Sequence, residues 1–313
     1  MTRRSRRLAK ERPGPSGFLV VDKPAGWTSH DVVDAARAWL GTRRVGHLGT
    51  LDPLATGALP LALRDATKLI PYLEAGPKRY RGIVRLGEET DTLDAEGQVV
   101  RRHPGPLPGE AALRSALEGL CGDIEQVPPM YSSVKRAGVP LYRLARRGEV
   151  VEREPRKIRI ERLELLAYDP PDVEIDVLCS PGTFVRVLAA DLGRELGCGA
   201  HVRTLRRTRS GPFGLAEAAP PELLEQEGQD GRLLTRVIPP ERALGFPSLT
   251  LSREEVRRVR HGGEIAVPRE ARLAVGDRAC ALDAEGTMLA VLEVRANRQL
   301  RPLRVLGSVA APG

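Results

Sequence analysis

The chain has 313 residues, more than one compact core usually holds, so we expect two domains. Its 41% hydrophobic and 29% charged residues exclude wholesale disorder, and no apolar run is long enough to span a membrane. The net charge of +8 and the pI near 9.7 suit a polyanionic partner without requiring one. The four cysteines lie far apart and form no zinc-ligand pair, which predicts reduced thiols, no metal site and a cytoplasmic protein.

The first elements have clear local patterns. Residues 1–16 are basic and rich in Arg, Pro and Gly, which predicts a mobile tail; no apolar run follows, so they do not form a secretory signal. Residues 17–23 are an apolar strand. Thr28 and Asp31 form a capping-box pattern for a helix that ends at Gly41. A loop dense in turn formers is then predicted over residues 46–57.

The remaining elements alternate between strands and helices. The segment 124–153 interleaves basic and aromatic residues, a pattern that fits a solvated surface loop as well as an RNA contact. In chain order, the patterns predict a helix at 65–75, a strand at 79–87, a polar connection at 90–97, a helix at 109–120, a strand at 173–179, a helix from 183 to 196, a strand at 202–207, an interdomain connection at 215–246, and a short helix with three or four strands at 249–306.

The predicted loop carries the most informative motif, Gly-His-Leu-Gly-Thr-Leu-Asp-Pro-Leu-Ala-Thr-Gly over residues 46–57. An isolated Asp-Pro most often only caps a turn. The whole run, however, resembles the active-site motif of bacterial tRNA pseudouridine synthases of the TruB family, Gly-His-x-Gly-x-Leu-Asp-Pro-x-Ala-x-Gly, and fills each of its fixed positions. The likeness covers about the first two-thirds of the chain in family order, through the segments 21–24, 78–81, 129–135, 179–186 and 196–202.

This resemblance implies a fold and a division of the chain. The expected fold class is α+β, with a mixed, mainly antiparallel sheet and flanking helices in a catalytic domain over residues 17–245. An RNA-contacting insertion would lie at about 124–153. A small β-barrel-like, PUA-like RNA-binding domain would follow over residues 246–313.

The resemblance also implies an activity: the isomerisation of uridine 55 in the T loop of tRNA to pseudouridine, without a cofactor and with tRNA as the only evident partner. Asp52 would be the catalytic carboxylate. A carboxylate can attack C1′ or C6, or remove a ribose proton in an elimination, and the sequence does not choose among these routes. A water-excluding pocket would raise the pKa of Asp52, so a fixed cation is needed to keep it ionised. Arg186 matches the family's arginine that pairs with this carboxylate.

Four more residues match substrate-binding positions of the family. Tyr80 would stack on the flipped base and assist proton transfer at C5. Phe184 stands where the family commonly has Tyr, so it keeps an aromatic face without a hydroxyl and is expected in the pocket wall. Leu205 matches an apolar pocket residue, and His47 one that contacts the displaced nucleotides. Taken singly, each of these residue types is more often core or an ordinary loop residue.

The basic segment would supply binding energy for base flipping through phosphate contact and stacking. Two other functions stay open: an RNA-folding factor in which catalysis is secondary or lost, and an enzyme for another RNA, as in the guide-RNA-dependent eukaryotic relatives. The intact Asp52 and Arg186 pair argues against the first, and the complete bacterial-type insertion against the second. The expected RNA-contacting residues are Lys135, Arg136, Arg146 and Arg147.

Overall fold

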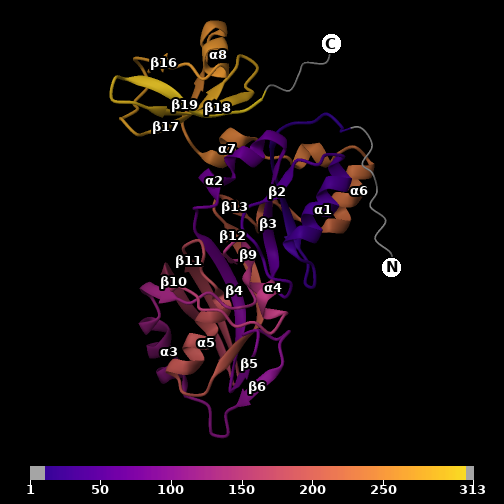
Figure 1. Ribbon diagram of the computed structural model, residues 1–313, viewed down its shortest axis with the longest axis vertical. Coiled ribbons are helices and arrows are strands. Elements are labelled where there is room, and N and C mark those ends of the chain that lie inside the picture. The colour runs from indigo at the N-terminus through magenta and orange to yellow at the C-terminus, as the bar shows by residue number, and fades with distance from the viewer. Residues whose placement is uncertain (1–10, 308–313) are drawn as a thin grey trace.

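The structure is a computed structural model that describes residues 11–307. A large sheet with flanking helices makes up the longer body, and a smaller sheet near the C-terminus makes up the second (Figure 1). The strands are β1 (Gly17–Lys23), β2 (Val45–His47), β3 (Thr56–Leu63), β4 (Lys78–Leu86), β5 (Glu88–Thr90), β6 (Val99–Arg102), β7 (Gly122–Gln126), β8 (Lys135–Arg136), β9 (Val139–Pro140), β10 (Arg156–Asp169), β11 (Asp172–Cys179), β12 (Ala200–Ser210), β13 (Phe213–Gly214), β14 (Ala218–Ala219), β15 (Ser248–Thr250), β16 (Ile265–Ala266), β17 (Arg278–Leu282), β18 (Met288–Val294) and β19 (Gln299–Val305). The helices are α1 (Ser29–Leu40), α2 (Ile70–Leu73), α3 (Glu110–Gly119), α4 (Leu141–Ala145), α5 (Val185–Glu195), α6 (Pro221–Gln229), α7 (Pro240–Leu244) and α8 (Arg253–Arg260), with short 3₁₀ turns η1 (Arg64–Leu69), η2 (Leu215–Glu217) and η3 (Leu233–Arg236).

The large sheet has ten strands, in the order β14-β1-β3-β12-β4-β11-β10-β7, with β13 on β12 and β2 on β3. Within the described residues its parallel pairs are β1 with β14 and β3 with β12, and its other pairs are antiparallel. The predicted α+β class with a mixed, mainly antiparallel sheet is therefore confirmed.

The centre of this sheet brings β3, β12 and β4 together. Arg207 on β12 lies opposite Gly57 on one side and Tyr80 on the other. Gly57 has a φ of 101°, and a Cβ atom there would lie 2.2 Å from the carbonyl oxygen of Arg207. Only glycine allows so close an approach of the two strands.

The helices cover the sheet as their amphipathic patterns predict. Thr28 and Asp31 form both hydrogen bonds of the capping box at the start of α1, and Gly41 ends the helix in the left-handed conformation. Helix α5 packs on β12, α3 on β10, and α1 on α6. Their buried faces join the sheet in the main hydrophobic core.

Two expectations differ from the structure. The predicted loop 46–57 includes part of β2 and the start of β3, because β3 is a nearly continuous apolar run buried between β1 and β12 rather than an alternating one. Residues 215–246 are not a free interdomain connection, since β14 pairs with β1 and α6 packs on α1.

A further expectation concerns the predicted tail over residues 1–16. Residues 1–10 lie outside the described residues, whereas residues 11 and 12 contact the larger body. Glu11 accepts hydrogen bonds from Thr42 and Arg64, and the amide of Arg12 donates to Gly41. Residues 11 and 12 are therefore bonded to the larger body, in part through buried Arg64, and the mobility expected of the tail stays a prediction.

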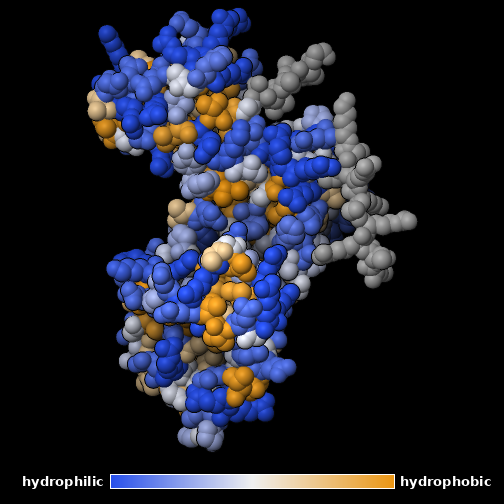
Figure 2. Space-filling view, in the orientation of Figure 1, coloured by the Kyte–Doolittle hydropathy of each residue, from blue (hydrophilic) through white to orange (hydrophobic). Residues whose placement is uncertain are grey.

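The C-terminal sheet has the strand order β15-β17-β18-β19-β16 and packs against α8, which matches the predicted small β module. A second apolar cluster joins it to the larger body, with Phe18 and Val20 of β1 on one side and Met288 and Val291 of β18 on the other. In the orientation of Figure 1, the surface is mainly hydrophilic, with apolar residues gathered over the middle of the larger body (Figure 2). None of the described helices is long and apolar enough to cross a membrane.

Candidate active site

Main-chain anchors hold the loop between β2 and β3 that carries Asp52. The Ser29 hydroxyl accepts from the amide of Leu51 at 2.8 Å and donates to its carbonyl at 3.1 Å. Buried Lys23 donates to the carbonyl of Pro53 at 3.1 Å. Lys23 also donates to the carbonyls of Pro24 and Trp27, so its ammonium group is held by three main-chain acceptors. The residues on both sides of Asp52 are thus fixed.

Arg207 fixes the same loop further upstream. Its side chain is 1% exposed, and its guanidinium donates to the carbonyls of Ala58 at 2.8 Å, Thr50 at 3.3 Å and Gly49 at 3.2 Å. The loop is therefore tied to β12 as well as to α1.

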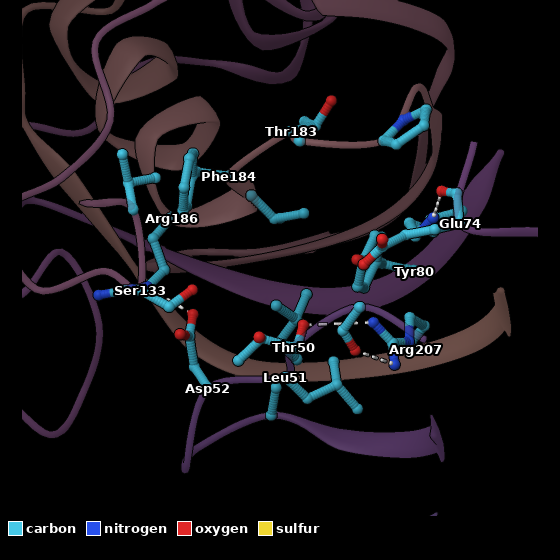
Figure 3. A pocket seen from close by; sticks show the side chains of 18 of the residues that line it. Thr50, Leu51, Asp52, Glu74, Tyr80, Ser133, Thr183, Phe184, Arg186 and Arg207 are labelled. Atoms are coloured by element: carbon cyan, nitrogen blue, oxygen red, sulfur yellow. Dashed lines mark hydrogen bonds and ion pairs between the residues drawn. The ribbon is translucent and has the colours of Figure 1, made fainter. Parts of the chain in front are cut away.

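Asp52 and Arg186 form an ion pair inside the protein (Figure 3). Arg186 is 3% exposed and donates from Nε to Oδ2 of Asp52 at 2.9 Å. Its other nitrogens donate to the carbonyls of Thr92 and Tyr131, each at 2.8 Å, and one lies 3.4 Å from the carboxylate of Asp94. Each nitrogen of the guanidinium has its own acceptor, which fixes the orientation of the group.

Electrostatics at Asp52 act in two directions. Burial raises the pKa of its carboxyl group, and the Arg186 charge opposes this effect. The carboxylate of Asp94 raises the pKa further. The pair therefore keeps a desolvated carboxylate next to a permanent cation, an arrangement that can supply a nucleophile or a base.

A cavity of about 410 Å³ opens beside this pair. It brings together five of the predicted site residues: Asp52, Tyr80, Phe184, Arg186 and Leu205. In Figure 3 the Asp52–Arg186 pair lies at one side of the cavity and Tyr80 at the other.

Tyr80 and Phe184 line this cavity from different elements, β4 and the start of α5. Tyr80 is 7% exposed on β4, and burial raises the pKa of its phenol. Phe184 is the N-cap residue of α5, and its main chain forms two hydrogen bonds with the side-chain amide of Gln126. An aromatic face is therefore held in place at position 184 without a hydroxyl group.

His47 lines the adjoining cavity of about 730 Å³, which shares Asp52 and Arg186 with the first. Its Nδ1 is buried with no hydrogen-bond partner among the described residues. Burial, followed by the charge of Arg207, lowers the pKa of the imidazole. The neutral ring therefore carries an unused polar atom next to the site.

The predicted RNA-contacting residues divide into two groups. Arg146 lines the larger cavity and its guanidinium lies 5.7 Å from the ring centre of Tyr142. Lys135, Arg136 and Arg147 are exposed on the surface of the insertion and line neither of these two cavities.

Sequence reasoning missed Asp94, Lys78 and Arg207 as site residues. Asp94 was placed only in a polar connection, yet it is 3% exposed and lies against Arg186. Lys78 and Arg207 line the smaller cavity and are buried. No local pattern marks these residues, since Asp94 lies in a polar turn and Lys78 and Arg207 stand next to the arginines at 79 and 206. Within residues 11–307, no group of three or more His, Cys, Asp and Glu side chains could hold a metal ion.

The chain is similar to known proteins of one family. Residues 37–185 match the TruB family pseudouridylate synthase N-terminal domain, and residues 186–244 match the tRNA pseudouridylate synthase B C-terminal domain. The protein named tRNA pseudouridine synthase B from Pseudomonas aeruginosa (strain UCBPP-PA14) is 43% identical to this chain, over 94% of this chain and 96% of that one. The protein of the same name from Geobacter sulfurreducens (strain ATCC 51573 / DSM 12127 / PCA) is 45% identical, over 82% of this chain and 88% of that one.

A solved structure supports the same fold. A chain in the crystal structure of a Cbf5-Nop10-Gar1 complex is 27% identical, with a TM-score of 0.68 over 95% of this chain and 85% of that one. The family domains, the relatives and this neighbour cover both the catalytic sheet and the Asp52 site. The chain belongs to the TruB family of pseudouridylate synthases.

Proposed function

We propose that this protein converts a uridine of tRNA to pseudouridine, with Asp52 as the catalytic carboxylate. The observation that carries the proposal is the ion pair between half-buried Asp52 and buried Arg186, at the wall of a cavity that Tyr80 and Phe184 also line. The curated relatives are named for this activity. A partly desolvated carboxylate beside a buried cation in a cavity is typical of catalytic sites, which favours an enzyme over a binding protein alone.

The reaction breaks the bond from ribose C1′ to uracil N1 and forms a bond from C1′ to C5, while the proton on C5 is replaced by one on N1. There is no net oxidation or reduction. Ionised Asp52 can attack C1′ or C6, or remove a ribose proton, and Arg186 stabilises the carboxylate in each case. Tyr80 and Phe184 would enclose the uracil, and Leu205 would exclude water beside it.

A target base inside a folded RNA must leave its stack to reach such a cavity. The volume of about 410 Å³ lies within the range of roughly 300–1,000 Å³ that is usual for small-ligand sites. The larger cavity, with His47 and Arg146, would take the neighbouring nucleotides. By resemblance to the family, the target is uridine 55 in the T arm, and the enzyme would meet its tRNA in the cytoplasm.

The direct test uses two synthetic T-arm stem-loops, one with tritium at C5 of the target uridine and one with tritium at C5 of a stem uridine. Purified protein is incubated with each in buffer without added cofactor. We expect tritium release from the first RNA alone, with an uncleaved chain that contains pseudouridine. No release, or release of free uracil, would contradict the proposal.

A further inference from the structure

The second buried arginine of the cavity, Arg207, has a different environment from Arg186. Arg186 lies next to two carboxylates, those of Asp52 and Asp94. Arg207 forms no ion pair among residues 11–307, and its hydrogen-bond acceptors are main-chain carbonyls. Its charge is therefore buried without a neutralising carboxylate, so it can act strongly on a neighbouring ionisable group.

That neighbour is Tyr80. The two residues lie directly opposite each other on the antiparallel strands β4 and β12, so their side chains project from the same face of the sheet. Both line the smaller cavity, and Figure 3 places them together on the side away from Asp52. A guanidinium can only donate hydrogen bonds, so in a hydrogen bond between the two side chains the phenol oxygen would be the acceptor.

We propose that Arg207 is a positioning residue, which holds the hydroxyl oxygen of Tyr80 as an acceptor and stabilises negative charge on it while it ties the Asp52 loop to β12. One side chain thus links the two parts of the site that a pseudouridine synthase must align. This role in catalysis rests on the proposed function, but the interaction itself exists in the protein without RNA. In any step in which Tyr80 gives or receives a proton, the charge on its oxygen would develop beside a permanent cation.

The other charged and titratable groups around Tyr80 do not replace this cation. Asp52 faces it from the loop and Cys179 from β11, and neither can carry a positive charge. Lys78 lies on the same strand, but burial lowers its pKa to about 8 and its ammonium group is held by the carbonyls of Glu74 and Gly76. Burial raises the pKa of Tyr80, and Arg207 is the largest opposing influence.

The test compares Arg207→Lys, which keeps the charge, with Arg207→Gln, which keeps donors but loses the charge. Tyr80 is replaced in each protein by 3,5-difluorotyrosine, whose more acidic phenol can be titrated at moderate pH by ¹⁹F NMR without RNA. The matched control is Arg206→Gln, the next residue on β12, which pairs with Asp22 instead. We expect the glutamine variant at 207 to titrate about 1–3 pH units above the lysine variant, the usual range for one adjacent opposite charge.

In the control Arg206→Gln, the phenol at position 80 should titrate at the same pH as in the unsubstituted protein. With ordinary Tyr80 and excess enzyme, the single-turnover rate should fall at least about tenfold further in Arg207→Gln than in Arg207→Lys, the effect of about one pKa unit of lost stabilisation, with similar tRNA affinity. Coincident titrations of the two variants would overturn the proposal, whatever the activity. If Arg207→Gln does not fold, Arg207→Lys is compared with the unsubstituted protein alone. If the phenol of Arg207→Lys titrates within about half a pH unit of the unsubstituted protein, the role of charge is supported, and a larger shift contradicts it.

The titration without RNA separates the two hypotheses. If the unsubstituted protein releases no tritium from the T-arm stem-loop, the proposed function fails. A difference between the glutamine and lysine titrations would still establish the coupling of Arg207 to Tyr80, and equal titrations in an active enzyme would refute only this inference.

Discussion

Replacement of Arg186 by lysine should slow isomerisation strongly although the charge is conserved. The guanidinium uses separate nitrogens for Asp52, Thr92 and Tyr131, at 2.9, 2.8 and 2.8 Å. One ammonium nitrogen cannot reach three acceptors that lie in different directions. If the carbonyl contacts are kept and the one to Asp52 is lost, the missing hydrogen bond of a charged group is worth about 1.5–3 kcal/mol, or roughly a 10- to 150-fold slower rate.

The assay is single-turnover tritium release from the T-arm stem-loop with enzyme in excess, together with a separate measurement of tRNA affinity. The matched control is Arg194→Lys on the same helix, an exposed residue paired with Asp191. A near-normal rate for Arg186→Lys would refute the reasoning. So would an equal loss of rate in both variants, because the effect would then belong to the helix rather than to the ion pair.

The pH dependence gives a second measure of the same pair. Arg186 opposes the burial that raises the pKa of Asp52, so Arg186→Gln should raise that pKa further. The active form is the ionised carboxylate, and the acid limb of the rate profile should therefore move to higher pH. Recovery of part of the activity at alkaline pH would support this sign, whereas a limb that moves to lower pH would contradict it.

Three further predictions concern side chains of the site and of the insertion. Asp52→Asn should abolish isomerisation and leave tRNA affinity within about threefold, because the amide keeps the shape but not the charge; measurable turnover would refute its role. Neutralising Arg146 and Arg147 together should weaken tRNA binding and reduce the salt dependence of the affinity, without changing the isomerisation rate at saturating RNA. An unchanged salt dependence of the affinity would place both residues outside the interface. Phe184→Tyr should keep turnover within about tenfold, whereas Phe184→Ala should lose about 1–3 kcal/mol of base stacking, as measured by single-turnover rate and affinity; the reverse order would remove position 184 from the pocket.

Local patterns in the sequence predicted the elements whose signals are local. The capping box of α1 is complete within four residues, and the alternating pattern of residues 173–179 gives β11 directly. Strand β3 was hidden because seven of its eight residues are buried, so no alternation marks it, and Pro60 resembles a turn former. A long apolar run of this kind can be assigned to a strand only when the neighbouring strands are known.

The site residues were likewise predicted only in part. The pairing of Asp52 with Arg186 was predicted from motif resemblance, although 134 residues separate them. The position of Asp94 beside Arg186 depends on how its turn pairs with Val202 of β12, and that of Arg207 beside Tyr80 depends on the register of β4 and β12. Neither relation has a local signature, because strand register is set by pairing over long distances.

The contact between Gly57 and Arg207 has a consequence for the interpretation of genetic variants. Gly57 is the last residue of the motif, so loss of activity on its replacement would suggest a role in the reaction. Its hydrogen atoms instead occupy space that a methyl group cannot enter without separating β3 from β12. Such a substitution would displace Arg207 and the loop of Asp52 together, and an inactive allele at position 57 would record a steric requirement of the sheet.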